Sequence, residues 1–139
     1  MYGKVIFICT GNTCRSPMAE GMFRAMCAQA GLQTEISSAG VGTFAGLPPT
    51  DAAVRAAAFY GADIAAHRSR VFSPLMIEDG TLFVCMTQSH AAALTAMGAD
   101  PGAIRVLDVR DPFGGDDVVY AACAEELHEK LLPILEELQ

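Results

Sequence analysis

One stretch near the N-terminus decides the fold: Val5-Ile6-Phe7-Ile8-Cys9-Thr10-Gly11-Asn12-Thr13-Cys14-Arg15-Ser16-Pro17. Its first five residues form a continuous apolar run, which is typical of a strand buried on both faces of a parallel sheet. Ser16-Pro17 has the residue types of an N-cap and a first helical position, and predicts a helix that runs to about Ala30 and stops at Gly31. The stretch therefore predicts a strand, a short loop and a helix.

Strand and helix signals alternate along the rest of the chain. Apolar runs predict strands over residues 34–39, 82–86 and 104–106, and helical patterns predict helices over 50–61, 89–97 and 118–138. A loop rich in Gly and Pro spans residues 40–49, and an acidic loop spans residues 108–117. This alternation indicates βαβ units and a mostly parallel sheet. We therefore expect an α/β fold in which residues 1–139 form a single domain.

Composition and charge limit the possible partners. The chain of 139 residues is 52% hydrophobic and 18% charged, so it holds enough apolar material for a substantial core. The formal net charge of −7 argues against nucleic acid and acidic membrane surfaces, since both attract clustered Lys and Arg. It does not oppose a small phosphorylated ligand, because a local positive site can lie inside an acidic protein. The sequence predicts no particular oligomeric state.

Cysteine usage indicates a reducing compartment. The five cysteines are an odd number and show no framework of short-spaced pairs, so we expect reduced thiols. The apolar run at residues 5–8 is too short for the hydrophobic part of a secretion signal, and no stretch approaches the length of a membrane span. These features predict a cytoplasmic location.

The loop after the first predicted strand has the residues of a phosphate site. Backbone N–H groups in a short strand-to-helix loop can converge on an anion, and the start of the helix adds its own N–H groups. Arg15, six positions after Cys9, can bind two phosphate oxygens. We expect the same positive field to lower the pKa of Cys9 and make it a nucleophile. The alternative is a buried structural Cys9 with a surface Arg15. The candidate phosphate-binding residues are Thr10, Gly11, Asn12, Thr13, Cys14 and Ser16.

The acidic loop offers the proton that a leaving group needs. Ligands of a parallel sheet bind beyond the carboxyl ends of its strands, and both the first loop and the acidic loop follow predicted strands. Asp111, which precedes Pro112, is therefore a candidate general acid, and later a general base for water. The alternative is that this Asp-Pro pair only forms a turn.

The chain resembles the low-molecular-weight protein tyrosine phosphatases. The match begins with the stretch from Cys9 to Glu20, and it continues through His67 and the segments Ser38-Ala39-Gly40, Met86-Thr87-Gln88-Ser89-His90 and Asp111-Pro112-Phe113. The resemblance implies a three-layer fold with a four-stranded parallel sheet flanked by helices. It implies no metal and no cofactor, and phosphorylated proteins as substrates.

The resemblance also assigns roles to individual residues. It implies a phosphocysteine intermediate on Cys9 and the role of general acid for Asp111. Asn12 and Ser16 match positions that shape the loop, and His67 matches a position in a supporting network. Cys14 matches a position whose thiol can form a reversible disulfide with the nucleophile and protect it from overoxidation.

Two features favour the protein-arginine phosphatase branch of that family. Thr13 stands where the tyrosine phosphatases usually carry a bulky aliphatic residue, and Phe113-Gly114-Gly115 follows the Asp-Pro pair. A threonine leaves room for a guanidinium and offers it a hydroxyl. Phe113 can stack on the guanidinium plane, and Asp111 can pair with its N–H groups. The alternative is a tyrosine phosphatase in which Phe113 contacts a phenyl ring.

Three other functions compete with a phosphatase. An arsenate reductase would need further cysteines to pass a disulfide outward, and Cys85 has no cysteine within the next thirty residues. A phosphocysteine carrier would need no built-in acid for water attack, and a binding module would need no intact Cys9, Arg15 and Asp111. The sequence assigns no role to His90, to His128, or to the remaining thiols of Cys27, Cys85 and Cys123.

Overall fold

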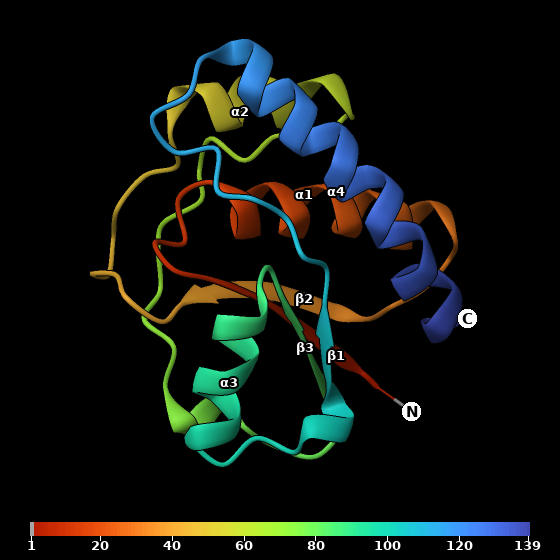
Figure 1. Ribbon diagram of the computed structural model, residues 1–139. Coiled ribbons are helices and arrows are strands. Elements are labelled where there is room, and N and C mark those ends of the chain that lie inside the picture. Colours follow the sequence, from red (N-terminus) through yellow and green to blue (C-terminus); the bar gives the residue numbers. More distant parts are fainter. Residues whose placement is uncertain (1) are drawn as a thin grey trace.

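A four-stranded parallel sheet with strand order β2-β1-β3-β4 forms the centre of the molecule (Figure 1). The computed structural model describes residues 2–139. The strands are β1 Lys4–Cys9, β2 Glu35–Gly40, β3 Thr81–Cys85 and β4 Ile104–Val106. The α-helices are α1 Arg15–Gln29, α2 Asp51–Phe59, α3 Gln88–Ala96 and α4 Asp117–Leu138, and the 3₁₀ helices are Pro74–Met76 and Pro101–Ala103. The predicted α/β fold with a parallel sheet is confirmed.

Helices cover both faces of the sheet and give three layers. Helices α1 and α4 lie on one side with α2 packed against them, and α3 lies on the other side (Figure 1). Strand β1 therefore has an apolar side chain at almost every position, because odd and even residues enter different cores. The core under α1, α2 and α4 takes Val5, Phe7 and Cys9, and the core under α3 takes Ile6 and Ile8.

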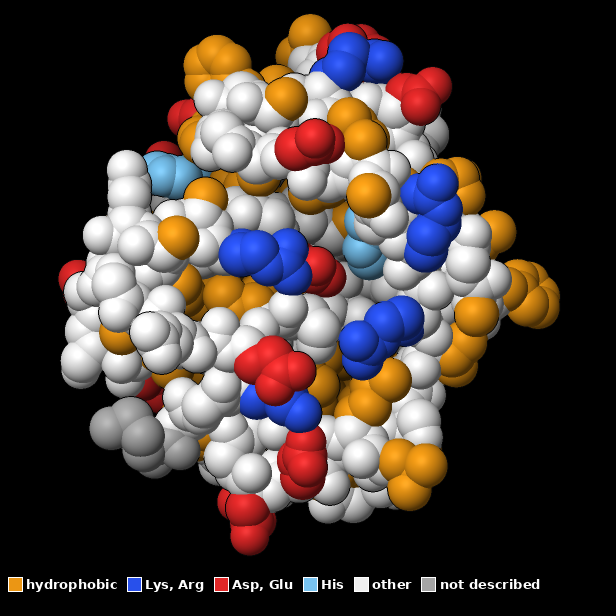
Figure 2. Space-filling model, turned by 180° about the vertical axis from the view of Figure 1, so that it is seen from behind, with side chains coloured by type: hydrophobic (Ala, Val, Ile, Leu, Met, Phe, Trp, Pro, Cys, Tyr) orange, Lys and Arg blue, Asp and Glu red, His pale blue; other side chains and the backbone are white. Residues whose placement is uncertain are grey.

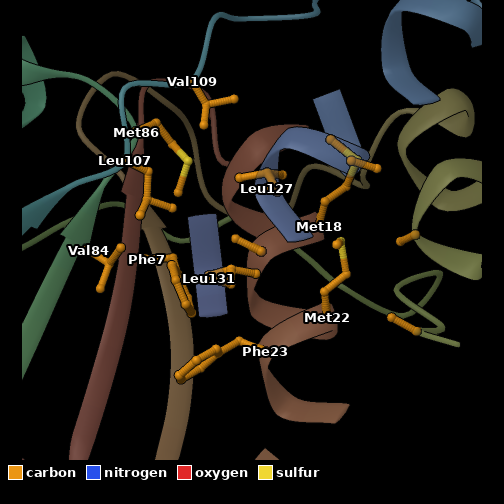
Figure 3. Packing of buried hydrophobic residues seen from close by; sticks show 14 of the residues in the cluster. Phe7, Met18, Met22, Phe23, Val84, Met86, Leu107, Val109, Leu127 and Leu131 are labelled. Carbon is orange, nitrogen blue, oxygen red and sulfur yellow. The ribbon is translucent and has the colours of Figure 1, made fainter. Parts of the chain in front are cut away.

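The larger core fixes the strand that carries Cys9. Figure 3 shows Phe7 of β1, Phe23 of α1, and Leu127 and Leu131 of α4 pointing into this core. The rings of Phe7 and Phe23 meet edge to face, with centroids 5.5 Å apart. Close packing of this kind leaves little freedom to the end of β1, so the loop that follows starts from a rigid position.

The first helix starts earlier than the sequence predicts. Helix α1 begins at Arg15, and its N-cap is Cys14 rather than Ser16. The Ser16 hydroxyl does not cap the helix, because it lies 2.8 Å from Cys9 Sγ inside the loop. Pro17 occupies the third helical position, which is tolerated since the N–H groups of the first turn have no partner within the helix.

The acidic loop reaches the carboxyl edge of the sheet as predicted. After β4, the backbone N–H of Leu107 donates to Cys85 O and that of Val109 donates to Met86 O. These two bonds extend the pairing with the β3 segment as far as Val109. Asp111 follows two residues later, at the same edge as Cys9.

The surface carries charges of both signs. Figure 2 shows basic and acidic side chains lying next to one another over the face seen from behind, with hydrophobic side chains between them. Among residues 2–139, no helix combines the length and the apolar character that crossing a bilayer requires.

Candidate active site

Cys9 stands at the carboxyl end of β1 and is only 2% exposed. Its sulfur lies 2.8 Å from Ser16 Oγ and accepts a hydrogen bond from the Asn12 backbone N–H at 3.2 Å. Burial raises the pKa of the Cys9 thiol, while the bonds from Ser16 and Asn12 and the charge of Arg15 act in the opposite direction. The expectation of a lowered pKa is therefore wrong, because removal of the thiol from water outweighs the hydrogen bonds and the positive field.

Asn12 holds the loop in its curled shape. Its φ of 55° lies in the left-handed region, which asparagine adopts more readily than most residues. The buried side-chain amide donates to Ser16 Oγ at 2.8 Å and to Ser38 Oγ at 2.9 Å, and its oxygen accepts from the Arg70 backbone N–H at 2.8 Å. All three side-chain bonds support the conformation that presents the Asn12 backbone N–H to Cys9.

Further polar residues form hydrogen bonds with Asn12 or with its partners. His67 Nε2 lies 2.9 Å from the Asn12 carbonyl oxygen, which can only accept, so this ring nitrogen carries a proton. Ser38 donates its hydroxyl to Glu20 at 2.6 Å, and the other ring nitrogen of His67 lies 3.9 Å from the same carboxylate oxygen. The structure thus places His67 against the loop that follows Cys9.

Gly40 allows the loop to pass close to the end of β2. A Cβ atom on Gly40 would lie 2.5 Å from the Thr10 carbonyl oxygen, which is too close for any other residue. Gly11 is under no such constraint, because a Cβ there would first meet Thr13 Oγ1, at 3.5 Å.

Arg15 joins the loop to the acidic loop. Its side chain is 5% exposed, Nη1 donates to the Val109 carbonyl oxygen at 3.0 Å, and Nη2 lies 3.7 Å from Asp111 Oδ2. The Asp111 side chain is 52% exposed and accepts from the Phe113 backbone N–H at 3.0 Å. The residues that the sequence proposed as nucleophile, phosphate ligand and acid therefore lie at one edge of the sheet.

The sequence pattern of the low molecular weight phosphotyrosine protein phosphatases matches residues 4–139. The chain belongs to this family. A protein-arginine-phosphatase of Bacillus subtilis (strain 168) is 34% identical over 97% of this chain and 96% of the relative. A low molecular weight protein-tyrosine-phosphatase of Streptomyces coelicolor is 39% identical over 81% of this chain and 73% of the relative.

Solved structures of the family are similar over nearly the whole chain. The crystal structure of a low molecular weight protein tyrosine phosphatase from T. tengcongensis has a TM-score of 0.90 at 36% identity, and covers 97% of this chain and 99% of that one. The YwlE arginine phosphatase, in a mutant with a phosphorylated active-site serine, has a TM-score of 0.90 at 32% identity and covers 97% and 95%. The predicted family and its three-layer fold are therefore confirmed.

Thr13 lies in the loop between β1 and α1, and Phe113 lies in the acidic loop between β4 and α4. The Thr13 side chain is half-buried, and its hydroxyl has one hydrogen-bond contact among the described residues, with Cys14 Sγ at 3.8 Å. Phe113 is 72% exposed. Both side chains are therefore at least partly accessible from outside the protein.

Cys14, the N-cap residue of α1, is buried. Its sulfur is 3.2 Å from the hydroxyl of Tyr120 in α4 and 3.8 Å from Thr50 Oγ1. A disulfide with Cys9 would have to replace these contacts. All five thiols are free in this structure.

Sequence reasoning missed the contact between His90 and the loop that follows Cys9. His90, which received no role, lies 2.9 Å from Thr10 Oγ1. The two residues are eighty positions apart, so no local pattern could connect them.

The described residues contain no group of three or more His, Cys, Asp or Glu side chains that could hold a metal ion.

Proposed function

We propose that the chain hydrolyses phosphoarginine in proteins through a phosphocysteine intermediate on Cys9. The observation that carries the proposal is the junction of two loops, in which Arg15 contacts both Val109 and Asp111 while Cys9 lies at the end of the adjacent strand. A buried nucleophile, a buried cation and a half-exposed carboxylic acid at one site are the parts that phosphoryl transfer needs.

In the first step, the Cys9 thiolate attacks phosphorus. A sulfur–phosphorus bond forms and the phosphorus–nitrogen bond breaks, while Asp111 gives its proton to the leaving guanidine nitrogen. The Ser16 hydroxyl and the Asn12 N–H stabilise the thiolate and act against the burial that raises the pKa of Cys9. Arg15 stabilises the charge on the transferred phosphoryl group.

In the second step, water attacks the phosphocysteine. Asp111 removes a proton from that water, the sulfur–phosphorus bond breaks, and inorganic phosphate leaves with the thiolate restored. The half-exposed Asp111 can reach water while its other oxygen stays near Arg15. The phosphorylated active-site serine in the YwlE mutant supports an intermediate on the corresponding residue here.

Three observations support arginine as the phosphorylated residue. Among residues 2–139, the Thr13 hydroxyl makes one long contact, with Cys14, and it can donate to or accept from a guanidinium or its water. Phe113 is exposed beside Asp111 and can stack on the guanidinium plane. Relatives named protein-arginine-phosphatase, from Bacillus subtilis and Geobacillus stearothermophilus, match 97% and 98% of this chain.

Phosphotyrosine is the second candidate substrate. The Streptomyces coelicolor relative, named a protein-tyrosine-phosphatase, has the higher identity of 39% over a shorter match. An exposed Phe113 could also pack against a phenyl ring.

The other enzymatic alternatives find less support. Burial raises the pKa of Cys85 and of Cys123 to about 12, so neither thiol is suited to a disulfide shuttle for arsenate reduction. A phosphocysteine carrier has no use for an acid such as Asp111 at the edge of the phosphate site.

The cytoplasmic location and the redox sensitivity expected from the sequence belong to the same proposal, since the reaction requires Cys9 to be a reduced thiol.

The deciding experiment compares phosphoarginine and phosphotyrosine peptides on one preparation. The proposal predicts turnover of both an aryl phosphate and the peptides, with the larger kcat/KM for phosphoarginine. Cys9→Ser should abolish turnover while phosphate-analogue binding survives, because a serine hydroxyl has too high a pKa to ionise in the loop. A Cys9→Ser protein as active as the parent would contradict the role of Cys9, and a larger kcat/KM for phosphotyrosine would reverse the choice of substrate.

A further inference from the structure

A buried histidine beside the loop has no part in the reaction outlined above. His90 lies in the first turn of α3 and is 4% exposed. Both of its ring nitrogens make hydrogen bonds: Nδ1 is 3.2 Å from the Thr87 backbone N and 3.1 Å from Thr87 Oγ1, and Nε2 is 2.9 Å from Thr10 Oγ1. The ring therefore connects the start of α3 to the residue that directly follows Cys9.

These contacts decide which ring nitrogen carries the proton. The Thr87 backbone N–H can only donate, so Nδ1 of His90 is the acceptor. In a neutral ring the proton then lies on Nε2, which donates to Thr10 Oγ1. Burial and the charge of Arg15 lower the pKa of His90 to about 4, against a smaller opposing effect of Asp111, so the ring is neutral at pH 7.

The direction of this bond determines what the Thr10 hydroxyl can do. Because its oxygen accepts from His90, its own proton remains to be donated, and His90 is the one partner of this hydroxyl among residues 2–139. The Thr10 methyl group faces Gly42, where a Cβ atom would lie 3.3 Å from it. The methyl group lies near Gly42 and the oxygen accepts from His90, so neither contact uses the hydroxyl proton of this exposed residue, which is free to be donated to a ligand.

We propose that His90 is a positioning residue that orients the Thr10 hydroxyl as a hydrogen-bond donor to the phosphoryl group held in the loop. The effect of this pair on turnover rests on the proposed phosphatase reaction. Its effect on the affinity for inorganic phosphate does not. The pair would supply a side-chain donor in addition to Arg15 and the loop backbone. A neutral histidine provides this orientation without adding a charge next to Arg15.

The primary test measures the affinity of the unmodified chain and its variants for inorganic phosphate by calorimetry. Thr10→Val keeps the shape of the side chain and removes the hydroxyl, and should weaken binding about tenfold, the effect of losing one hydrogen bond to a charged group. Thr10→Ser keeps the hydroxyl and should stay within about twofold of the parent. Thr95→Val is the matched control, because it removes a hydroxyl from α3 that donates to Ala91 O within the same helix.

The role of His90 is tested through its coupling to Thr10. His90→Leu removes the donor and should weaken phosphate binding about as much as Thr10→Val, whereas the amide N–H of His90→Gln can replace Nε2 and should restore most of the affinity. The double variant Thr10→Val/His90→Leu should bind phosphate no more weakly than either single variant. A purely structural histidine would instead lower the melting temperature without changing the phosphate affinity of the folded protein.

Phosphate affinity and turnover, measured on the same variants, distinguish failure of this proposal from failure of the proposed function. If Thr10→Val and the parent bind phosphate equally, or if the two single losses multiply in the double variant, the Thr10–His90 proposal is overturned while the phosphatase assignment stands. Failure of the parent to bind phosphate overturns it as well. A different outcome is that the parent and its variants show the expected phosphate affinities while the parent hydrolyses no phosphate ester or phosphoarginine peptide. In that case the proposed function fails and the Thr10–His90 proposal stands.

Discussion

Replacement of Asn12 by alanine should damage both the stability and the chemistry of this protein. The Asn12 side chain is fully buried and makes three hydrogen bonds, with Ser16, Ser38 and the Arg70 backbone. Each such bond contributes about 1 kcal/mol net. An alanine at a φ of 55° costs about 1 kcal/mol more, because asparagine tolerates the left-handed region better than alanine does. Together these losses amount to about 4 kcal/mol.

A loss of this size is easily measured. In a chain of 139 residues, 1 kcal/mol corresponds to about 3 °C in melting temperature, so Asn12→Ala should melt about 12 °C below the parent. The free energy of unfolding in urea should fall by the same 4 kcal/mol with an unchanged slope. Well below its melting temperature, the variant should still lose kcat, since the Asn12 N–H no longer has a fixed direction toward Cys9.

Asp100→Ala is the matched control. Asp100 also bonds a backbone N–H through its side chain, to Gly102 at 3.0 Å, but in an exposed turn. Its removal should cost less than about 1 kcal/mol, because water replaces the lost partner. If Asn12→Ala and Asp100→Ala melt within about 3 °C of one another, or if Asn12→Ala retains the parental kcat, the loop does not depend on the Asn12 network.

The remaining predictions concern the acid, the substrate and the second cysteine. Asp111→Asn should lower kcat by about 10²–10⁴ for poor leaving groups and much less for a nitrophenyl phosphate, which departs without a proton; equal losses along a leaving-group series would remove Asp111 from the acid role. Thr13→Ile should shift the ratio of kcat/KM values about tenfold from phosphoarginine toward phosphotyrosine peptides, with an unchanged melting temperature, and an unmoved ratio would mean that Thr13 is not the selector. Cys14→Ala should recover less activity than the parent when peroxide treatment is followed by a thiol reductant, because no neighbouring thiol captures the Cys9 sulfenic acid; full recovery would refute a protective disulfide.

Local patterns were sufficient to predict the strand–loop–helix unit and the position of its loop. The apolar run ending at Cys9 is long enough only for a strand buried on both faces, and the helix that follows puts Arg15 at its start. The N-cap assignment failed because Ser16 has a stronger partner in three dimensions, the sulfur of Cys9. A propensity rule describes an average residue and cannot anticipate a competing tertiary contact.

The sequence pattern could not predict contacts between residues that are far apart in the chain. The bond between Thr10 and His90 joins residues on different elements, and no spacing rule relates them. The pKa of Cys9 was misjudged for a related reason. Its donors are local and visible in the sequence, whereas the burial that opposes them comes from the whole core behind β1.

The acidic character of the chain and its phosphate site are compatible because they act over different distances. At physiological ionic strength, exposed charges farther than about 8 Å apart are largely screened, so the net charge of −7 has little influence inside the loop. Arg15 is shielded from water by its burial and faces one half-exposed carboxylate at 3.7 Å. The Val109 carbonyl oxygen accepts one of its hydrogen bonds, but the charge of the guanidinium is only weakly compensated, and in the proposed reaction a phosphate dianion would complete this compensation. In the proposed function, this desolvated cation would therefore bind phosphate together with the N–H groups of the loop, while the surface around the site can vary in charge.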